Sequence, residues 1–432
     1  MAYSTAALLE DTLEEKMNFK EFLLMFLLLL VTGNPYFVHH FSTLIIPTIV
    51  IPLYYIFKKS YRQISYRTVF IIFFMLGYEV VHALMFTLDY SFTIIKLAIV
   101  LLLALSTVML LGERFIKVLT GTMVVITLIS FVFTILCYIP GISTFLYHLA
   151  EDLFPIEKDF KHFTTPTLLV YTFSYEYFYG EFSYVRNPAI FWESGAFAVF
   201  LNITLYLHYI TKNVRHVRDL FDRPAAILIL GVLSTTSTMG FFALVVILTF
   251  FTFQLRTQLK FLFLILVVVS SWFAYNNVEY LGAKINQQIS EGDTRNNRFN
   301  AALRDMEDIS KRPLLGWSRR IEVLFKTKEH SQKTRRPNGL TNFIRCYGLV
   351  YFTIYFVLVF TSFSNITKFY NGYSRPGLAF FGIILLWIVS FSELLFDLPF
   401  FKALVFLYSA YYPYLNAREE KILAEAELTT TT

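Results

Sequence analysis

The sequence has few charged residues and almost no cysteine for its length. Charged side chains make up 16% of the 432 residues, whereas hydrophobic ones make up 56%. A soluble domain carries about 25% charged residues, so this composition argues against one. The only two cysteines, Cys137 and Cys346, lie in apolar segments, which argues against a disulfide framework or a thiolate metal site.

Two motifs that serve phosphate and metal chemistry are also missing. The sequence has no glycine-rich phosphate-binding loop, which argues against a soluble nucleotide-linked substrate. It has no cluster of carboxylates at a spacing that would bind a divalent metal. We therefore expect neither a metal nor another cofactor, and no nucleic-acid partner.

Long apolar segments recur along the whole chain. A helix that crosses a bilayer needs about 20 mostly apolar residues, and many segments reach or approach this length. We therefore predict an all-α polytopic membrane protein with about twelve transmembrane helices. The predicted spans are 18–32, 36–57, 67–88, 92–111, 117–139, 189–210, 224–238, 240–254, 261–275, 340–361, 377–394 and 398–412.

Lys and Arg clusters in the short connections predict the orientation, because positive charge stays on the cytoplasmic side. Counting spans between these clusters places both termini inside. The acidic leader lacks a small-residue cleavage site, so we interpret the first span as retained. The chain then divides into N-terminal helices (1–139), a first periplasmic loop (140–188), central helices (189–275), a basic periplasmic loop (276–339) and C-terminal helices with a cytoplasmic tail (340–432).

The two long outer loops carry most of the polar residues. The second holds 13 Lys/Arg against 8 Asp/Glu, a surplus of +5 in a chain of net charge +6. The first contains an alternating aromatic run that predicts a small hairpin or flap. Its side chains suit either an interfacial aromatic belt or a sugar-stacking surface; they are Tyr171, Phe173, Tyr175, Tyr177, Phe178 and Tyr179.

The segment 224–254 is too short for two full spans, yet basic connections flank it on both sides. We predict two short helices, or a re-entrant pair, that meet at the hydroxyl-rich turn Ser234–Gly240. Irregular backbone at membrane depth is tolerated only where it is buried in protein or lines a wet cavity. The turn therefore predicts a recess in the outer leaflet.

Ionisable residues concentrate where the first outer loop returns to the membrane. Pro188 suits the first position of a helix, which would put Arg186 at the membrane surface and Glu193 one to two turns inside. An ionisable residue inside a bilayer costs about 2.5–3.5 kcal/mol on insertion scales, so Glu193 is a candidate site residue. Each residue also has a structural alternative. Glu193 could pair with an Arg to fix helix packing, and Arg186 could anchor the chain at the membrane interface.

Four motifs in this order resemble the bacterial O-antigen polymerase and O-antigen ligase superfamily. Arg186 followed by Phe191-Trp192-Glu193-Ser194-Gly195-Ala196-Phe197 resembles its "R…FWEPGxF" segment, and Leu233 to Gly240 resembles "LSTTSTxG". Arg298 followed by Arg312-Pro313-Leu314-Leu315-Gly316-Trp317 is similar to "R…A…PLLGWG". The fourth is Asn338-Gly339-Leu340 through Gly348. Ser194 and Ser318 depart from the pattern, and Pro337 stands where ligases tend to carry a His.

The resemblance implies a metal-independent glycosyltransferase of the inner membrane. Such an enzyme takes a glycan from undecaprenyl diphosphate on the periplasmic face and transfers it to an acceptor hydroxyl. For a polymerase of O-antigen or another surface polysaccharide, the acceptor is a second lipid-linked repeat unit. For a ligase it is the lipid A core of lipopolysaccharide. Pro337 favours the polymerase, and the family implies a chain-length regulator as a further partner.

The residues suggest how such chemistry would be divided. Arginine can stabilise the charge of a departing diphosphate, so Arg186 and Arg298 are the first candidates for this role. Arg295 and Arg319 are candidate helpers. The alternative for these two is contact with anionic lipid head groups. Apolar residues at 299, 302, 306 and 309 predict an amphipathic helix that lies on the membrane and presents Arg298. Candidate bases are Glu193 and His330. Further candidate contacts to the diphosphate or glycan are Thr236, Ser237, Tyr184 and Asn338.

A transporter of lipid-linked oligosaccharides is the competing class. Transporters tend to show paired halves with broken helices in corresponding positions. Here the spans are asymmetric and the polar residues lie in two loops, which favours the enzyme.

Overall fold

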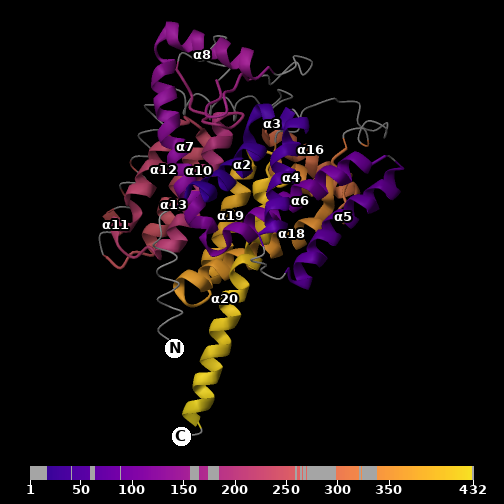
Figure 1. The fold of residues 1–432 in the computed structure, drawn as a ribbon, viewed down its shortest axis with the longest axis vertical. Helices are drawn as coiled ribbons and strands as arrows, with labels where there is room; N and C mark the ends of the chain where they lie inside the picture. Colours follow the sequence, from indigo (N-terminus) through magenta and orange to yellow (C-terminus); the bar gives the residue numbers. More distant parts are fainter. Residues whose placement is uncertain are drawn as a thin grey trace.

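The structure is a computed structural model, and all of its regular elements in the described part of the chain are helices (Figure 1). It describes residues 17–39, 41–58, 64–87, 89–155, 165–173, 184–257, 260–262, 265, 269, 298–320, 323 and 338–430. The first half contains α2 (Phe19–Gly33), α3 (Pro35–His39), α4 (Phe41–Phe57), α5 (Tyr66–Phe86), α6 (Ser91–Leu111), the 3-10 turn η1 (Gly112–Arg114), α7 (Phe115–Cys137) and α8 (Pro140–Leu153). The second half contains α10 (Ser194–Lys212), α11 (Val217–Leu220), α12 (Arg223–Ser234), α13 (Thr238–Phe253), α16 (Arg298–Lys311), α18 (Gly339–Asn371), α19 (Pro376–Ser390) and α20 (Pro399–Thr430).

The apolar helices indicate a membrane protein. Within the described residues, four helical stretches are long and apolar enough to cross a bilayer: Tyr66–Phe86, Ser91–Cys137, Ser194–Lys212 and Gly339–Asn371. α5 exposes large apolar side chains, with Phe70 at 70%, Phe73 at 69% and Leu84 at 76% exposure. Apolar surface of this extent on one helix suits contact with lipid.

Most predicted spans coincide with helices. Each begins within a few residues of an observed helix, except 261–275, most of which lies outside the described residues. The all-α class is thus confirmed for the described part of the chain. That every one of these helices crosses the membrane stays a prediction.

α10 is the central helix of the bundle. Its side chains from Ala196 to Ile210 are buried on all sides, as expected for a helix that is hydrophobic all round. α7 and α12 pack against it, as do α13, α18 and α19. Residues just before α10 are therefore held close to several other helices.

Helices α8 and α16 belong to the two long connections. In Figure 1, α8 lies at the end of the bundle opposite to the projecting last turns of α20. That the two long loops share a face stays a prediction. Which face is periplasmic stays a prediction.

The hydroxyl-rich turn joins two short helices, as predicted. α12 ends at Ser234, and α13 begins at Thr238 with Ser237 as its N-cap, whose side chain accepts a hydrogen bond from the Gly240 amide. Thr236 in the turn has a φ of 48°, a conformation that non-glycine residues seldom adopt. The sharp turn needs this backbone conformation.

The predicted helix start at Pro188 is wrong. α10 begins at Ser194 with Glu193 as its N-cap, so Glu193 lies at the helix entrance rather than one to two turns inside. Hydrogen bonds hold residues 187–190 in a turn instead. The Asn187 side chain accepts from the Ala189 amide at 3.0 Å, and Asn34 donates to the Ile190 carbonyl at 3.2 Å.

The aromatic run of the first outer loop is not an exposed flap where the structure describes it. Tyr171 is 1% exposed and Phe173 is fully buried, both packed near Tyr147 of α8. A single antiparallel bridge joins Thr167 to Thr172. Neither described aromatic can form a surface for lipid or sugar, and the remaining four lie outside the described residues.

Candidate functional site

A segment of the basic loop docks onto a break in α18. The segment Arg312–Ser318, called the docked segment below, forms backbone hydrogen bonds to both sides of the break. Trp317 N donates to Arg345 O and Ser318 N to Cys346 O, both at 2.8 Å, and Leu349 N donates to Pro313 O at 2.7 Å. Backbone groups freed by the broken helix are thereby satisfied.

Two glycines make this docking possible. Gly348 lies at the break with φ 70° and ψ 175°, and Gly316 in the docked segment has a φ of 73°. A Cβ on Gly348 would lie 2.2 Å from the Leu314 carbonyl oxygen, and one on Gly316 would lie 2.5 Å from the Cys346 carbonyl oxygen. Glycine is therefore required on both sides, which gives a physical reason for this residue in both the third and the fourth motif.

The docked segment leads directly into a buried network of charges. Arg319 Nε lies 3.3 Å from Glu79 Oε1, and Lys402 Nζ lies 3.3 Å from Asp397 Oδ1. Between the two pairs, the Tyr347 hydroxyl lies 3.3 Å from Glu79 Oε1 and 3.0 Å from Asp397 Oδ1. Glu79 and Lys402 are fully buried, whereas the side chains of Arg319 and Asp397 are partly exposed. Buried charges are usually paired and mark functional regions of membrane proteins.

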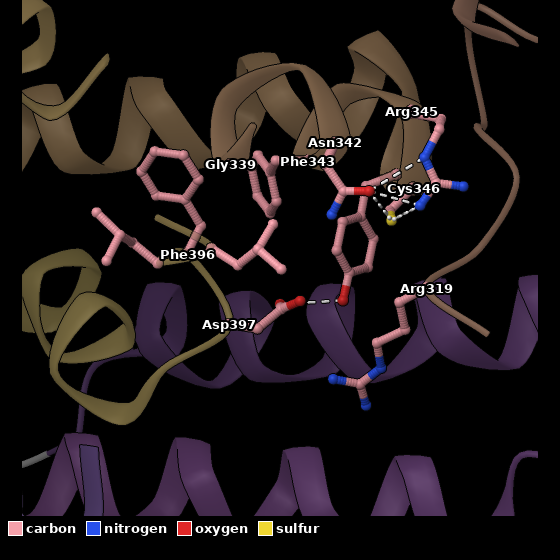
Figure 2. A pocket seen from close by; sticks show the side chains of 11 residues that line it. Arg319, Gly339, Asn342, Phe343, Arg345, Cys346, Phe396 and Asp397 are labelled. Atoms are coloured by element: carbon pink, nitrogen blue, oxygen red, sulfur yellow. Dashed lines mark hydrogen bonds between the residues drawn. The ribbon is translucent and has the colours of Figure 1, made fainter. Parts of the chain in front are cut away.

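A pocket of about 200 Å³ opens beside this network. Figure 2 shows that Asn342, Phe343 and Arg345 of α18 line it. Phe396 and Asp397 line it from the turn that precedes α20, and Arg319, which directly follows the docked segment, lines it as well. The remaining lining residues are Gly339, Cys346, Tyr347, Leu394 and Leu395.

Two carboxyl groups meet at the entrance of α10. Glu393, in the turn between α19 and α20, is 7% exposed and lies next to the Glu193 carboxyl group. Gly195 leaves room for the pair, because a Cβ there would lie 3.1 Å from Glu393 Oε1 and 3.5 Å from Glu193 Oε1. Burial and the adjoining Glu193 carboxyl raise the pKa of Glu393 well above its ordinary value. Burial beside another carboxyl group therefore disfavours the charged form of Glu393.

Residues from two other motifs surround this carboxyl pair. The Arg298 guanidinium is close enough to interact electrostatically with Glu393. Gly339, the first residue of α18, packs so closely on the Glu393 backbone that a Cβ would overlap its carbonyl oxygen. Oε1 of Glu393 and Nδ2 of the fully buried Asn338 have no hydrogen-bond partner within the described residues.

Two predicted site residues, Arg186 and Thr236, are also brought together. Arg186 Nε donates to Thr236 Oγ1 at 3.3 Å, which links the first motif to the second. The neighbouring Asn187 side chain donates to Ser130 Oγ at 2.8 Å and to Ser234 Oγ at 2.9 Å. These bonds fix Arg186 at the hydroxyl-rich turn.

The other predicted site residues fall into two groups. Ser237 caps α13 and Asn338 caps α18, so their side chains support helix ends. Tyr184 lies in the described part of the chain, with its hydroxyl buried. Arg295 and His330 lie outside the described residues.

The helix that carries Arg298 begins where predicted. α16 begins at Arg298 and packs on α18 with Ala301, Asp305 and Asp308 buried. Of the predicted apolar stripe, Ala302 is 6% exposed and Met306 is 57% exposed. That the stripe lies on the membrane stays a prediction. The acidic side is buried because α18 offers partners, and Thr341 donates to Asp305 at 2.7 Å.

Several charged residues of these sites were missed from the sequence. Glu79, Arg345 and Lys402 each interrupt an apolar run, and Glu393 and Asp397 lie between two of them. The rule that singled out Glu193, an ionisable residue in an apolar segment, applies equally to the first three. The rule would have found these three residues, but not the residues with which they pair.

Comparison with protein-family models, curated proteins and solved structures finds no match to this chain. The resemblance described above therefore depends on the four motifs alone.

Proposed function

We propose that this chain is a membrane glycosyltransferase that polymerises a surface polysaccharide such as O-antigen. In this proposal it transfers a glycan from undecaprenyl diphosphate to a sugar hydroxyl of a second lipid-linked repeat unit. The reaction takes place on the periplasmic face of the bacterial inner membrane.

The observation that carries the proposal is the convergence of the four motifs. Arg186 of the first motif bonds to Thr236 of the second. Glu193 of the first, Arg298 of the third and Gly339 of the fourth each lie close to Glu393. The docked segment then joins the third motif to the fourth a second time. Contacts between segments far apart in sequence thus link all four motifs, which contain the arginines and the carboxylate that we assign to glycosyl transfer from a diphosphate.

The proposed chemistry divides between the carboxyl pair and the arginines. The acceptor hydroxyl oxygen attacks the anomeric carbon, and the bond from that carbon to the phosphate oxygen breaks. We assign Glu193 as the member of the pair that accepts the hydroxyl proton, because burial disfavours the charged form of Glu393. The lipid diphosphate departs with the bonding electrons, and Arg186 and Arg298 stabilise its charge.

The test is a reconstituted reaction. The purified full chain is incubated in detergent, with a chelator, with undecaprenyl-diphosphate repeat units from its own host, and the products are separated on a gel. A ladder of products is expected from the wild type. Arg186→Ala and Arg298→Ala are expected to abolish it, whereas Arg218→Ala, which removes an exposed charge on α11, should preserve it.

Other results would point elsewhere. Transfer only after addition of lipid A core would replace the polymerase by a ligase. No transfer with either acceptor, together with movement of lipid-linked oligosaccharide across vesicle membranes, would replace the enzyme by a transporter.

A further inference from the structure

The Arg345 guanidinium has an unused donor beside the pocket. Arg345 is 5% exposed, its Nε lies 3.5 Å from Asp305 Oδ1, and its Nε and Nη2 both donate to Asn342 Oδ1. Nη1 is buried and has no hydrogen-bond partner among the residues that the structure describes. A buried guanidinium donor without an acceptor is costly, so an acceptor from a ligand would be favourable here.

The pocket has the size and walls for one compact group. Its volume of about 200 Å³ is several times the ~30 Å³ that one water occupies, but it is smaller than the ~300–1,000 Å³ of sites for whole drug-sized ligands. Phe343, Tyr347 and Phe396 form much of the wall. Aromatic walls exclude water and so strengthen an interaction with a charged group.

Three cation–carboxylate pairs lie around the pocket. Arg345 pairs with Asp305, Arg319 with Glu79, and Asp397 with Lys402. Lys96 of α6 lies near enough to interact with both Arg319 and Asp397. It adds a positive charge beside these balanced pairs, and a positive charge favours an anion over a neutral ligand.

We propose that this pocket binds an oxyanion, with Arg345 Nη1 as the donor that contacts it and Arg319 contributing its charge from the opposite wall. The planar guanidinium suits phosphate and carboxylate oxygens alike. The existence of the site is independent of the proposed glycosyl transfer. The source of the oxyanion depends on that function: a phosphate of the lipid diphosphate, or the carboxylate of an acidic sugar in the glycan.

The test measures binding rather than turnover. Inorganic diphosphate, glucuronate and glucose are titrated into the purified full chain by calorimetry, with ionic strength held constant by NaCl. Arg345→Gln is combined with Asp305→Asn, so that the buried carboxylate is not left without its partner. Arg218→Gln removes the same charge from an exposed position on α11 and is the matched control.

Diphosphate is expected to bind the wild type and Arg218→Gln equally well. It is expected to bind the Arg345→Gln/Asp305→Asn variant about tenfold or more weakly, because that variant loses a charge-assisted hydrogen bond. The same pattern with glucuronate in place of diphosphate supports the site and assigns it to an acidic sugar. Equal binding of glucose, no binding of either anion, or anion binding unchanged in the double variant would overturn the proposal. Unfolding temperatures of the three proteins verify that each is folded. Anion binding without any product ladder would contradict the proposed function and leave this site standing.

Discussion

Replacing Gly348 by alanine tests the docking of the basic loop onto α18. The φ of 70° and ψ of 175° belong to a region that only glycine occupies freely, which costs another residue about 2 kcal/mol. The new Cβ would also lie 2.2 Å from the Leu314 carbonyl oxygen, so the docked segment has to move away. Its hydrogen bonds to α18 are then lost, and each contributes about 1 kcal/mol.

Strain and two to four lost hydrogen bonds together predict a destabilisation of about 4–6 kcal/mol, a large part of the 5–15 kcal/mol typical of whole proteins. The free energy of unfolding is measured by titration with SDS in mixed micelles. Gly77→Ala in α5 is the matched control, because a Cβ there meets nothing within 4 Å. It should change stability by no more than about 1 kcal/mol, in the stabilising direction.

Thiol labelling gives an independent measure of the same movement. Cys346 is 4% exposed, and its carbonyl accepts a hydrogen bond from the docked segment. In a Cys137→Ser background, a maleimide should modify Cys346 slowly in the otherwise native chain and much faster after Gly348→Ala. Wild-type stability with a protected Cys346 in the Gly348→Ala variant would refute the described docking.

Three further predictions concern the two other parts of the candidate site. Asn187→Ala removes the side chain that bonds to Ser130 Oγ, Ser234 Oγ and the backbone, and should lower the free energy of unfolding by about 2–3 kcal/mol in the same titration; no loss would contradict the assigned bonds. Glu393 has a raised pKa in the folded chain, so it contributes stability that is lost as pH rises above its ordinary value of 4.5. Glu393→Gln should therefore unfold with a flatter pH dependence than the wild type and gain relative stability towards alkaline pH; parallel curves would rule out the raised pKa of Glu393. Arg186→Ala and Arg298→Ala should each reduce polymer formation about 100-fold or more, whereas a chelator should leave the wild-type rate unchanged; a rate restored by added Mg²⁺ would contradict this.

Much of the helical architecture could be predicted from the sequence, because apolar length alone specifies a membrane helix. The pair α12 and α13 followed from basic connections on both sides of a short apolar stretch. The start of α10 could not be predicted in this way. It depends on the Asn34 side chain, which lies 156 residues from the Ile190 carbonyl that it binds.

Part of the candidate site could be predicted, because several of its residues belong to the four motifs. Arg186 and Thr236 lie in motifs and prove to be bonded, and Glu193 and Arg298 prove to be neighbours of one carboxyl group. The pairing of the buried charges was not predictable, because tertiary packing decides which partner each residue meets. The face that α16 buries illustrates this, since Asp305 is fully buried against α18 although its spacing suggests a solvated side.

The reciprocal fit of Gly316 and Gly348 also bears on how related chains could be found. Because neither glycine has a side chain, the backbones of the two segments can lie against each other. A Cβ on either glycine would overlap the backbone of the opposite segment. Any chain built with this junction is expected to carry glycine at both positions, whatever the length of the stretch between them. A search that requires the two glycines jointly, with a variable interval, would recognise the architecture where alignment of whole sequences does not.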